Sequence, residues 1–461
     1  MEVTSPTFPV EASATLRQHR PIRVASVASI LSGTIGIAMT FDADLRATTN
    51  DAHSGAPLRR DQRTTTLPST ADVVVIGGGI VGTSTALALA RAGLRPVIVE
   101  LGDSLANLTT ANASANVRAD YASRAEVALI NDGLAFYDDF AARTGLAVHD
   151  ADIDFERHGG MFATTEPDGI VRLAALVERQ RALGVVNASV LSGDDARRDH
   201  PWLAPTVTAA MMRPHDGWPS AVRATELMAR ASGAPICLET AVDDFIVQAG
   251  RLTGLRTSRG IISTGRAVVA TGPFVATLIR GALPIRLVRR HRLTVGSHPA
   301  IPRGAPLTVD LDFGAYWRPQ MDAAILAWPR DFSAGPPLSP VPIDPSFPDA
   351  ILRDPDGVQR ISPFWRTIAA ELPLDGWDLA AGQFDVTPDN GPIIDELEDR
   401  RGIWINAGYS GQGLIASPAG AQLLADLITG TRHPADNPFR RSRFPADAAL
   451  RSAGGSRPVR A

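Results

Sequence analysis

The chain contains no lysine, so all 45 of its basic residues are arginine. No side-chain amine is available to form a Schiff base, which excludes lysine-dependent aldolase and pyridoxal-phosphate mechanisms. Cysteine is almost as scarce, because Cys237 is the only one. A disulfide framework and a cysteine zinc site are therefore excluded. The apolar neighbours of Cys237 predict a small, buried side chain.

A strong charge imbalance is also missing. The 45 basic and 49 acidic residues leave a net charge of −4. No basic block stands in the part expected to fold, so nothing indicates a nucleic-acid partner. The spacing of His, Cys and Asp residues matches no metal site. With 461 residues, 44% of them apolar, the chain can form two domains or one elaborated domain.

The two ends of the chain lack the periodicity of helices and strands. Residues 1–70 are rich in Ser, Thr, Pro and Ala, which predicts a disordered extension, and residues 446–461 are predicted to be a second disordered tail. Residues 24–41 carry no charge and loosely resemble an export signal, but they are too polar for a membrane span. We expect a cytoplasmic protein whose extension is a tail or precedes the true start, with export as the alternative.

The most informative motif lies near the start of the folded part. Gly77, Gly79 and Gly82 have GxGxxG spacing directly after the apolar run Val73–Ile76, which predicts a buried parallel strand. The first glycine allows a tight turn, the second a close approach of pyrophosphate, and the third contact between helix and sheet. A helix then follows to Ala92, and its first N–H groups, at Ile80 and Val81, would face the phosphates.

A second strand, Pro96 to Val99, ends at Glu100, about 20 residues past the glycines. A carboxylate at that strand end accepts hydrogen bonds from a ribose diol and would repel a 2′-phosphate. The motif therefore predicts FAD or NAD rather than NADP as the ligand.

A related pattern stands near the other end of the chain. A strand over residues 402–406 leads into Gly408, Gly411 and Gly413, and a helix is predicted from about Ser417 to Thr429. A glycine-rich turn before a helix places backbone N–H groups against an electron-rich ring edge.

These motifs together resemble the D-amino-acid oxidase superfamily of FAD enzymes, in the branch of sarcosine oxidases, glycine oxidase and the dimethylglycine dehydrogenase type. The resemblance runs from about Ala71 to Phe444. Besides the glycine motifs and Glu100, the segments that carry it are Arg157–Ala163, Asp216-Gly217, Val269–Gly272, Thr387–Asp389 and Arg443-Phe444.

The resemblance implies an α/β fold, with a Rossmann-like FAD-binding domain of discontinuous segments and a substrate domain with an antiparallel sheet over the flavin. It implies FAD-domain residues 71–155, 207–285 and 376–445, and substrate-domain residues 156–206 and 286–375. The positions that match the family's FAD contacts are Gly77, Gly79, Ile80, Val81, Gly82, Glu100, Val242, Thr271, Gly272, Asp389, Gly408, Gly411, Gln412, Gly413 and Leu414.

Two departures from the family pattern concern the flavin. Relatives tether it through a cysteine, where this chain reads Ala381-Gly382-Gln383, or through a histidine, where it reads Thr109 to Asn112. We therefore expect FAD to be held without a covalent bond. Monomeric sarcosine oxidases also place a lysine beside the flavin, on the strand that here is residues 324–328. Its absence leaves oxygen or another electron acceptor open.

The resemblance implies removal of hydride from the carbon next to an amine, so the protein needs to orient the substrate. A substrate carboxylate would need an arginine, since the guanidinium pairs with it at two points. Arg318 is the first candidate, with a structural ion pair as the alternative. Gln320 stands where glycine oxidase has its arginine. Arg118 lies in the segment that passes along the flavin in relatives.

Several further side chains are candidates for the site. Gln412 could hydrogen-bond the flavin or face solvent, and Tyr316 and Tyr409 fall in motif segments, which favours the pocket. Neutral, packed histidines are expected at His158 and His291, with a role as a base as the alternative. Two tryptophans, Trp317 and Trp328, are expected to fill the roof of the cavity, with an aromatic substrate cage as the alternative.

Oxidation of a C–N bond in a small amine, an N-methyl amino acid or a D-amino acid is the leading hypothesis. The alternative is a flavoprotein subunit of a larger dehydrogenase that passes electrons to a partner. An aromatic-ring monooxygenase shares the first motif, but that class has a Gly-Asp-Ala-Ala-type motif late in the chain, where this sequence has Gly408 to Gly413.

Overall fold

The computed structural model describes residues 62–116, 123–185, 187–279, 283–329, 332–333, 335–371 and 377–445. The tails predicted over residues 1–61 and 446–461 lie outside this range. Residues 62–70 do not behave as an extension, because they pair with the fold: Thr64 N donates to Ile236 O over 3.1 Å and Ala71 N to Ser263 O over 3.1 Å. The side chain of Gln62 is buried and donates to the carbonyl of Ala229. The fold therefore begins at least nine residues before the expected boundary at Ala71.

A six-stranded sheet carries the first and last motifs. Its order is β17(Ile393–Glu396), β18(Ile403–Ala407), β10(Ala267–Val269), β1(Val73–Ile76), β2(Pro96–Val99) and β6(Ile236–Cys237). All neighbours are parallel except β17 and β18. Every residue of β1 and β2 is buried, which is typical of parallel strands covered on both faces.

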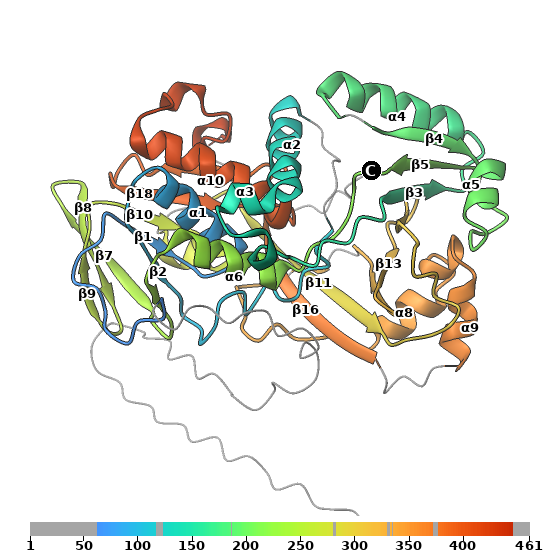
Figure 1. Ribbon diagram of the computed structural model, residues 1–461, viewed down its shortest axis with the longest axis horizontal. Coiled ribbons are helices and arrows are strands. Elements are labelled where there is room, and N and C mark those ends of the chain that lie inside the picture. Colours follow the sequence, from blue (N-terminus) through green and yellow to red (C-terminus); the bar gives the residue numbers. More distant parts are fainter. Residues whose placement is uncertain are drawn as a thin grey trace, which may run out of the picture. The chain divides into compact units, whose positions relative to one another are not determined.

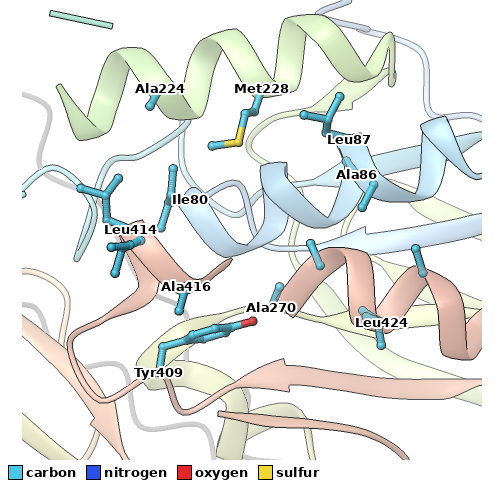
Figure 2. Packing of buried hydrophobic residues seen from close by; sticks show 14 of the residues in the cluster. Ile80, Ala86, Leu87, Ala224, Met228, Ala270, Tyr409, Leu414, Ala416 and Leu424 are labelled. Atoms are coloured by element: carbon cyan, nitrogen blue, oxygen red, sulfur yellow. The ribbon is translucent and has the colours of Figure 1, made fainter. Parts of the chain in front are cut away.

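Four helices form the layer over this sheet: α1(Ile80–Arg91) and α10(Gly413–Thr429) contact the sheet and each other, α6(Ala221–Ser232) packs on α1, and α2(Arg124–Asp138) packs on α10. Figure 1 shows α1, α6 and α10 gathered beside β1, β2, β10 and β18. Their contact surface is rich in alanine and leucine, and Figure 2 shows Leu87 and Met228 within it. These small and unbranched side chains let the helices approach closely.

Helix α10 begins at Gly413, four residues before the expected start at Ser417. Pro418 lies inside the helix, where it lacks the N–H that would bond the carbonyl four residues back. The hydroxyl of Tyr137 in α2 donates to that carbonyl, Leu414 O, over 2.7 Å. A bond between helices therefore replaces the one that proline removes.

A nine-stranded sheet forms the second layer. Its order is β15(Phe332–Ser333), β11(Arg286–Val295), β14(Ala323–Ala327), β13(Tyr316–Gln320), β12(Leu307–Asp310), β3(Gly160–Thr164), β5(Ala209–Arg213) and β4(Ser189–Ser192), and β16(Trp377–Val386) also pairs with β11. All pairs are antiparallel except β12 with β3.

The two faces of this sheet differ, because side chains alternate along each strand. On one face, Leu293, Trp317 and Leu326 are fully buried against α8(Phe347–Arg353) and α9(Phe364–Glu371). On the other, Arg292, Tyr316 and Arg318 share a face, since Arg292 and Tyr316 both lie opposite Ala327. We call this second side the arginine face.

The remaining elements complete these layers. A small antiparallel sheet consists of β7(Val242–Gln248), β8(Arg251–Thr257) and β9(Gly260–Ser263). The other helices are α3(Phe140–Thr144), α4(Gly169–Leu183), α5(Gly193–Asp199) and α7(Val275–Leu278). Helix α4 lies over β4 and β5 (Figure 1). Among the described residues, no helix combines the length and apolarity that crossing a bilayer requires.

Two domain boundaries differ from the expectation. Strands β5 and β16 belong to the nine-stranded sheet, whereas the expected boundaries at residues 207 and 376 place both in the FAD-binding domain. The reason lies in pairing between segments distant in sequence: β5 pairs with β3, and β16 pairs with β11 over its full length of ten residues.

The tightest contact between α2 and α10 generates a stability prediction. A Cβ on Gly133 would lie 1.9 Å from the carbonyl oxygen of Ile415. Gly133→Ala gains about 1 kcal/mol of helix propensity, but the forced shift costs about 1–3 kcal/mol. We expect a net loss of about 1 kcal/mol, and at most about 2 kcal/mol, in the free energy of unfolding, measured by urea denaturation.

The matched control is Gly304→Ala, because a Cβ there meets nothing within 4 Å. It should change stability by at most about 0.5 kcal/mol. Equal urea midpoints for the two variants would show that the helix contact tolerates the added methyl group.

Candidate active site and cofactor cradle

The first glycine turn is shaped by close backbone contacts. Gly77 has a φ of +112°, a conformation that favours glycine. A Cβ on Gly77 would lie 2.5 Å from Ala270 O, and one on Gly82 would lie 1.9 Å from Gly77 O. At Gly79 the only atom a Cβ would meet is Thr110 Oγ1, at 3.2 Å. Gly77 and Gly82 therefore let the chain pack on itself, while the space beside Gly79 is more open.

The first turns of α1 and α10 lie side by side. A Cβ on Gly413 would lie 3.8 Å from Ile80 and 3.6 Å from Val81, and Figure 2 shows Ile80 beside Leu414. The cap residues Gly79 and Gln412 provide no side-chain hydrogen bond. Two helix N-termini with positive dipole ends therefore converge, an arrangement that favours an anionic ligand.

Glu100 stands at the end of β2, as the motif predicts. Its carboxylate accepts hydrogen bonds from Gly78 N over 2.6 Å and from Gly102 N over 2.7 Å. Burial raises the pKa of Glu100, and the two N–H bonds oppose that shift. The carbonyl of Glu100 accepts from Thr240 N over 2.9 Å, which brings the predicted contact Val242, at the start of β7, near this strand end.

Thr271 and Gly272 follow β10 on the same edge of the sheet. The buried hydroxyl of Thr271 has no hydrogen-bond partner in the part of the chain that the structure describes, and Gly272 has a φ of +52°. An orphaned hydroxyl, a half-buried carboxylate and two helix N-termini suit the hydroxyl and phosphate groups of a dinucleotide. We call this set, with the turn at Gly408–Gly413, the cofactor cradle.

The turn at Gly408–Gly413 is held by a residue that the sequence did not single out. Asp385, buried at the end of β16, accepts from Gly408 N over 2.5 Å, and its carbonyl accepts from Ser410 N over 3.0 Å. Burial raises the pKa of Asp385. The signal in the sequence that could have indicated Asp385 is its position: it is an acidic residue among apolar residues at a strand end, two residues before Thr387.

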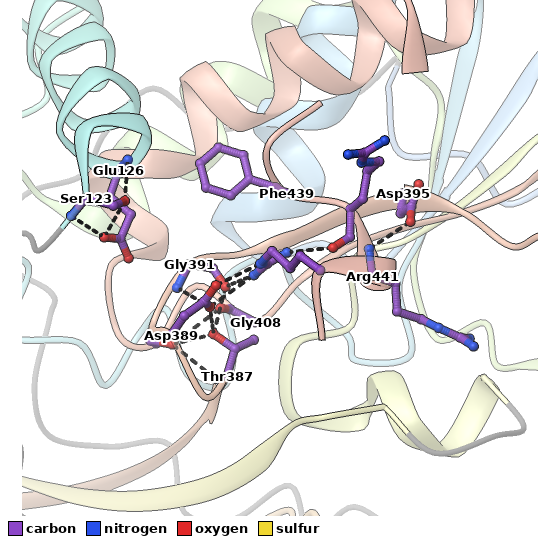
Figure 3. A network of polar contacts seen from close by, with 12 residues as sticks. Ser123, Glu126, Thr387, Asp389, Gly391, Asp395, Gly408, Phe439 and Arg441 are labelled. Atoms are coloured by element: carbon purple, nitrogen blue, oxygen red, sulfur yellow. Dashed lines mark hydrogen bonds and ion pairs between the residues drawn. The ribbon is translucent and has the colours of Figure 1, made fainter. Parts of the chain in front are cut away.

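Asp389, a predicted cofactor contact, has other partners in the structure. Both of its oxygens accept from the guanidinium of Arg443, over 2.7 and 3.1 Å, and Gly391 N donates to it over 3.1 Å. Burial opposes ionisation, but the arginine bonds prevail and lower the pKa of Asp389. Figure 3 shows this network beside Ser123 and Glu126 of the α2 N-terminus, where an open pocket of about 570 Å³ lies. Asp389 thus anchors the C-terminal segment.

One short stretch connects the cradle to the arginine face. Thr110 Oγ1 accepts from Ile80 N over 3.2 Å. The carbonyls of Ala111 and Ala113 accept from Arg292 over 2.9 and 3.3 Å, and that of Ser114 accepts from Arg318. We call residues 110–114 the linking segment.

Arg318 is the most deeply buried cation of the arginine face, with 3% of its surface exposed. Its Nε and Nη2 donate to Ser114 O over 3.0 and 2.9 Å, and Nη1 donates to Pro319 O over 3.2 Å. The guanidinium lies 4.9 Å from the centre of the Trp218 ring. Burial lowers the pKa of Arg318 to about 9, so that it remains a cation at pH 7.

The alternative role for Arg318, a structural ion pair, is not what these contacts show. No carboxylate of the described residues lies within 4.0 Å of its guanidinium; its partners are carbonyl groups. It therefore fixes the linking segment while carrying a charge that no carboxylate of the described residues pairs with directly.

Three neighbours of Arg318 complete this part of the site. The Tyr316 hydroxyl and Ser114 Oγ are 2.8 Å apart. Asn116 Oδ1 and Trp218 Nε1 are buried and have no partner among the described residues. The motif Asp216-Gly217 was visible in the sequence, but the role of Trp218 was not. Its contact with Arg318 of β13 arises only when the chain folds.

Other predicted residues lie elsewhere or have structural roles. Arg118 lies outside the described residues, and Gln412 is half-buried at the start of α10. Tyr409 is a core residue rather than a pocket residue: it is 3% exposed and its hydroxyl donates to Asn406 Oδ1 over 2.6 Å. It appears in Figure 2 within the apolar cluster.

The two tryptophans expected in the roof belong to the opposite face. Trp317 is fully buried against α9 and donates to Ser362 Oγ, and Trp328 donates to Phe313 O, each over 2.9 Å. His291 accepts from Asp344 N, and burial lowers its pKa, as expected of a neutral histidine. His158 stacks on the Trp218 ring, with 5.4 Å between the ring centres.

The two positions where relatives tether the flavin meet in space. A Cβ on Gly382 would lie 3.2 Å from Cβ of Asn112. Neither residue has a nucleophilic side chain. No group of three His, Cys, Asp or Glu side chains within the described ranges is placed to hold a metal ion.

Comparison with known proteins identifies the family. The model of the FAD dependent oxidoreductase (DAO) family matches residues 72–427. A glycine oxidase of Pseudomonas putida is 25% identical over 378 residues, covering 78% of this chain and 94% of that protein. The 4-methylaminobutanoate oxidase (formaldehyde-forming) of Paenarthrobacter nicotinovorans is 25% identical over 79% of this chain. Human mitochondrial sarcosine dehydrogenase is 26% identical over 80% of it. The match spans only 44% and 41% of the latter two relatives.

Solved structures share the fold. The L-proline dehydrogenase from P. horikoshii matches with a TM-score of 0.70 at 24% identity, over 82% of this chain and 98% of that one. Glycine oxidase from Geobacillus kaustophilus matches with a TM-score of 0.69 at 22% identity, over 82% and 100%. Since the family model covers most of the chain, and the cradle has the groups that a dinucleotide requires, this protein is an enzyme of the FAD-dependent oxidoreductase (DAO) family.

Proposed function

We propose that this enzyme oxidises a carbon–nitrogen bond of a small amino acid or amine, such as an N-methyl or D-amino acid, to an imine. The observation that carries the proposal is Arg318, a buried cation beside Tyr316 whose described partners include no carboxylate. A buried unpaired charge is costly, so a site that keeps one is suited to a ligand that brings the opposite charge.

The relatives support the same class of substrate. Their names are glycine oxidase, sarcosine dehydrogenase and 4-methylaminobutanoate oxidase, and each denotes a small amine that bears a carboxylate. The arginine fork binds such a carboxylate at two points, and this fixes the orientation of the neighbouring carbon–nitrogen bond.

Bound FAD supplies the chemistry, since the flavin accepts a hydride from the carbon next to nitrogen. The chain's own residues orient and enclose the substrate. Arg318 holds the carboxylate, the Tyr316 hydroxyl provides a hydrogen-bonding group, and the Trp218 ring limits water at the cation. The linking segment sets this arrangement relative to the cradle, through Thr110 on one side and Ser114 on the other.

FAD is held without a covalent bond in this proposal, because Gly382 and Asn112 meet where relatives form the tether. The electron acceptor is oxygen or another molecule. On β14, Ile325 and Ala327 lie on the arginine face, where an amine would assist oxygen. These apolar side chains support the second candidate, a flavoprotein subunit that passes electrons to a partner protein.

Precipitation of the full-length protein with acid tests the mode of FAD attachment. Non-covalent FAD is released when the protein unfolds, so we expect the yellow colour in the supernatant, measured by its absorbance near 450 nm. Flavin that remains in the washed pellet would show a covalent bond formed by some other residue.

Glu100 is expected to anchor the adenosine ribose. Glu100→Ala removes charge-assisted hydrogen bonds of about 1.5–3 kcal/mol, so that FAD affinity should fall roughly tenfold or more, measured by fluorescence titration of the apoprotein. Because burial raises the pKa of Glu100, its carboxylate is protonated at a higher pH than an ordinary Glu, and FAD affinity should fall correspondingly early on acidification.

The control is Glu226→Ala on α6, since burial also raises the pKa of that carboxyl but it lies outside the cradle. It should retain the affinity and the pH profile of the wild type. If Glu100→Ala also retained both, the ribose would be held by other groups.

Arg318 variants test the substrate class together with the reaction. Under anaerobic conditions, N-methyl or D-amino acids should bleach the flavin absorbance of the wild type. Arg318→Lys keeps the charge but loses the paired N–H geometry, so half-saturation by the amino acid should rise about tenfold without a change in the flavin spectrum. Arg318→Met should be worse.

Amines without a carboxylate are the matched comparison for these variants. They should react equally slowly with wild type and variant. Equal loss toward both kinds of amine would assign Arg318 a structural role only, and failure of every amine and amino acid to bleach the wild-type flavin would overturn the proposed function.

A further inference from the structure

Arg292 is the second cation of the arginine face. It lies opposite Ala327 of β14, and Tyr316 of β13 lies opposite the same residue from the other side. Arg318 is two residues farther along β13, so that all three side chains project from one side of the sheet. The charge of Arg292 is close enough to contribute to lowering the pKa of Arg318. Arg292 and Arg318 therefore lie on the same face of the sheet.

Both guanidinium groups are held by the same stretch of backbone. Arg292 Nη1 donates to Ala111 O and Ala113 O, over 2.9 and 3.3 Å, and Arg318 donates to Ser114 O. Three acceptor carbonyls within four residues bring the two cations to neighbouring points of the linking segment. They cannot move apart without a change in that segment.

Each guanidinium retains donors that these bonds do not use. A guanidinium has five N–H donors. In Arg318 one donor on each of its three nitrogens is used. In Arg292 only Nη1 has an acceptor among the described residues, and its buried Nε has none. Unused donors on a buried cation are expensive unless a ligand accepts from them.

No carboxylate of the described residues forms a hydrogen bond with either cation; Glu156, whose charge raises the pKa of Arg318, lies more than 4.0 Å from its guanidinium. The nearest carboxylate to Arg292 among the described residues is that of Asp378, 3.9 Å from Nη2, which is beyond hydrogen-bonding distance, and none lies within 4.0 Å of Arg318. A single substrate carboxylate would neutralise one of the two. Arg292 is paired with Ala327 on one neighbouring strand, β14, and with Ala380 on the other, β16. The small side chains of these alanines leave space beside the guanidinium of Arg292.

We propose that the substrate carries two carboxylates, one held by Arg318 and the other by Arg292. The chemical class is an amino acid whose side chain or nitrogen substituent ends in a second carboxylate. This inference rests on the proposed function for the oxidised bond, but the recognition of two negative charges stands on the two arginines alone.

Equilibrium binding of unreactive acids to the full-length, FAD-loaded enzyme tests the proposal. The probes are malonate, succinate and glutarate, each compared with the monocarboxylate of equal chain length, propionate, butyrate or valerate. We expect the best dicarboxylate to bind at least about tenfold more tightly than its monocarboxylate, measured by calorimetry. This ratio, rather than either affinity, is the quantity that Arg292 should determine.

Three variants assign the ratio to Arg292. Arg292→Gln should reduce it to about one, because the second charge is lost, whereas Arg292→Lys should retain part of it, because attraction persists without the fork. Arg289→Gln is the matched control, since it removes the same charge from the other face of β11, where the arginine reaches Pro342 O. It should leave the ratio as in the wild type.

Equal binding of mono- and dicarboxylates by the wild type would overturn the proposal. So would an unchanged ratio in Arg292→Gln, which would show that Arg292 only holds the carbonyls of the linking segment. If Arg292→Gln fails to fold, the proposal is still tested by the affinity ratio of the wild type and by that of Arg292→Lys. The acids are not oxidised, so their binding is independent of flavin bleaching. Failure of the proposed reaction is therefore seen separately, as the absence of bleaching with every amine.

Discussion

The hydrogen bonds from two arginines to the carbonyls of the linking segment are the contact on which the site depends. They join side chains of β11 and β13, in the nine-stranded sheet, to a segment that also touches the first turn of α1. Each bond is charge-assisted and hence stronger than one between neutral groups. Short hydrogen bonds therefore connect the cofactor cradle to the arginine face.

A second connection supports the first. Strand β16 pairs with β11 along its whole length. Near its end lies Asp385, whose carboxylate accepts a hydrogen bond from Gly408 N. Ala115, which follows the linking segment, has a φ of +59°, a conformation that costs a non-glycine residue about 1–2 kcal/mol. Strain of this kind persists only where neighbouring bonds hold it. Here the two bonds from Arg318 to the carbonyl of Ser114 hold the residue next to Ala115.

The sequence predicted the features that depend on local geometry. Gly77, Gly82 and Glu100 follow from strand, turn and helix within one segment, and the structure places them at the expected edge of the sheet. The position of Trp317 was also contained in the sequence: Tyr316 and Arg318 are two residues apart on a strand, so the residue between them must face away. The expectation that Trp317 lines the cavity is therefore wrong, because the alternation places Trp317 on the face opposite to Tyr316 and Arg318.

Other features required the fold. Arg318 and Ser114 are separated by 204 positions, and no periodicity indicates that they meet. Asp389 matched a family motif, but its bonds to Arg443 depend on a segment 54 residues later. Asp385, Trp218 and Arg292 became visible as functional candidates only through burial and proximity, since single residues of these types are common in any chain.

The proline in α10 has a consequence for how precisely the cofactor is positioned. An uncapped first turn frays readily, because its carbonyl and amide groups can exchange their partners for water. In α10 the Tyr137 hydroxyl, buried in α2, bonds the carbonyl that Pro418 leaves free, so the turn that presents its N–H groups to the ligand is fastened from outside. The helix dipole is thus preorganised before any ligand arrives, and binding need not spend free energy on ordering this end of the helix.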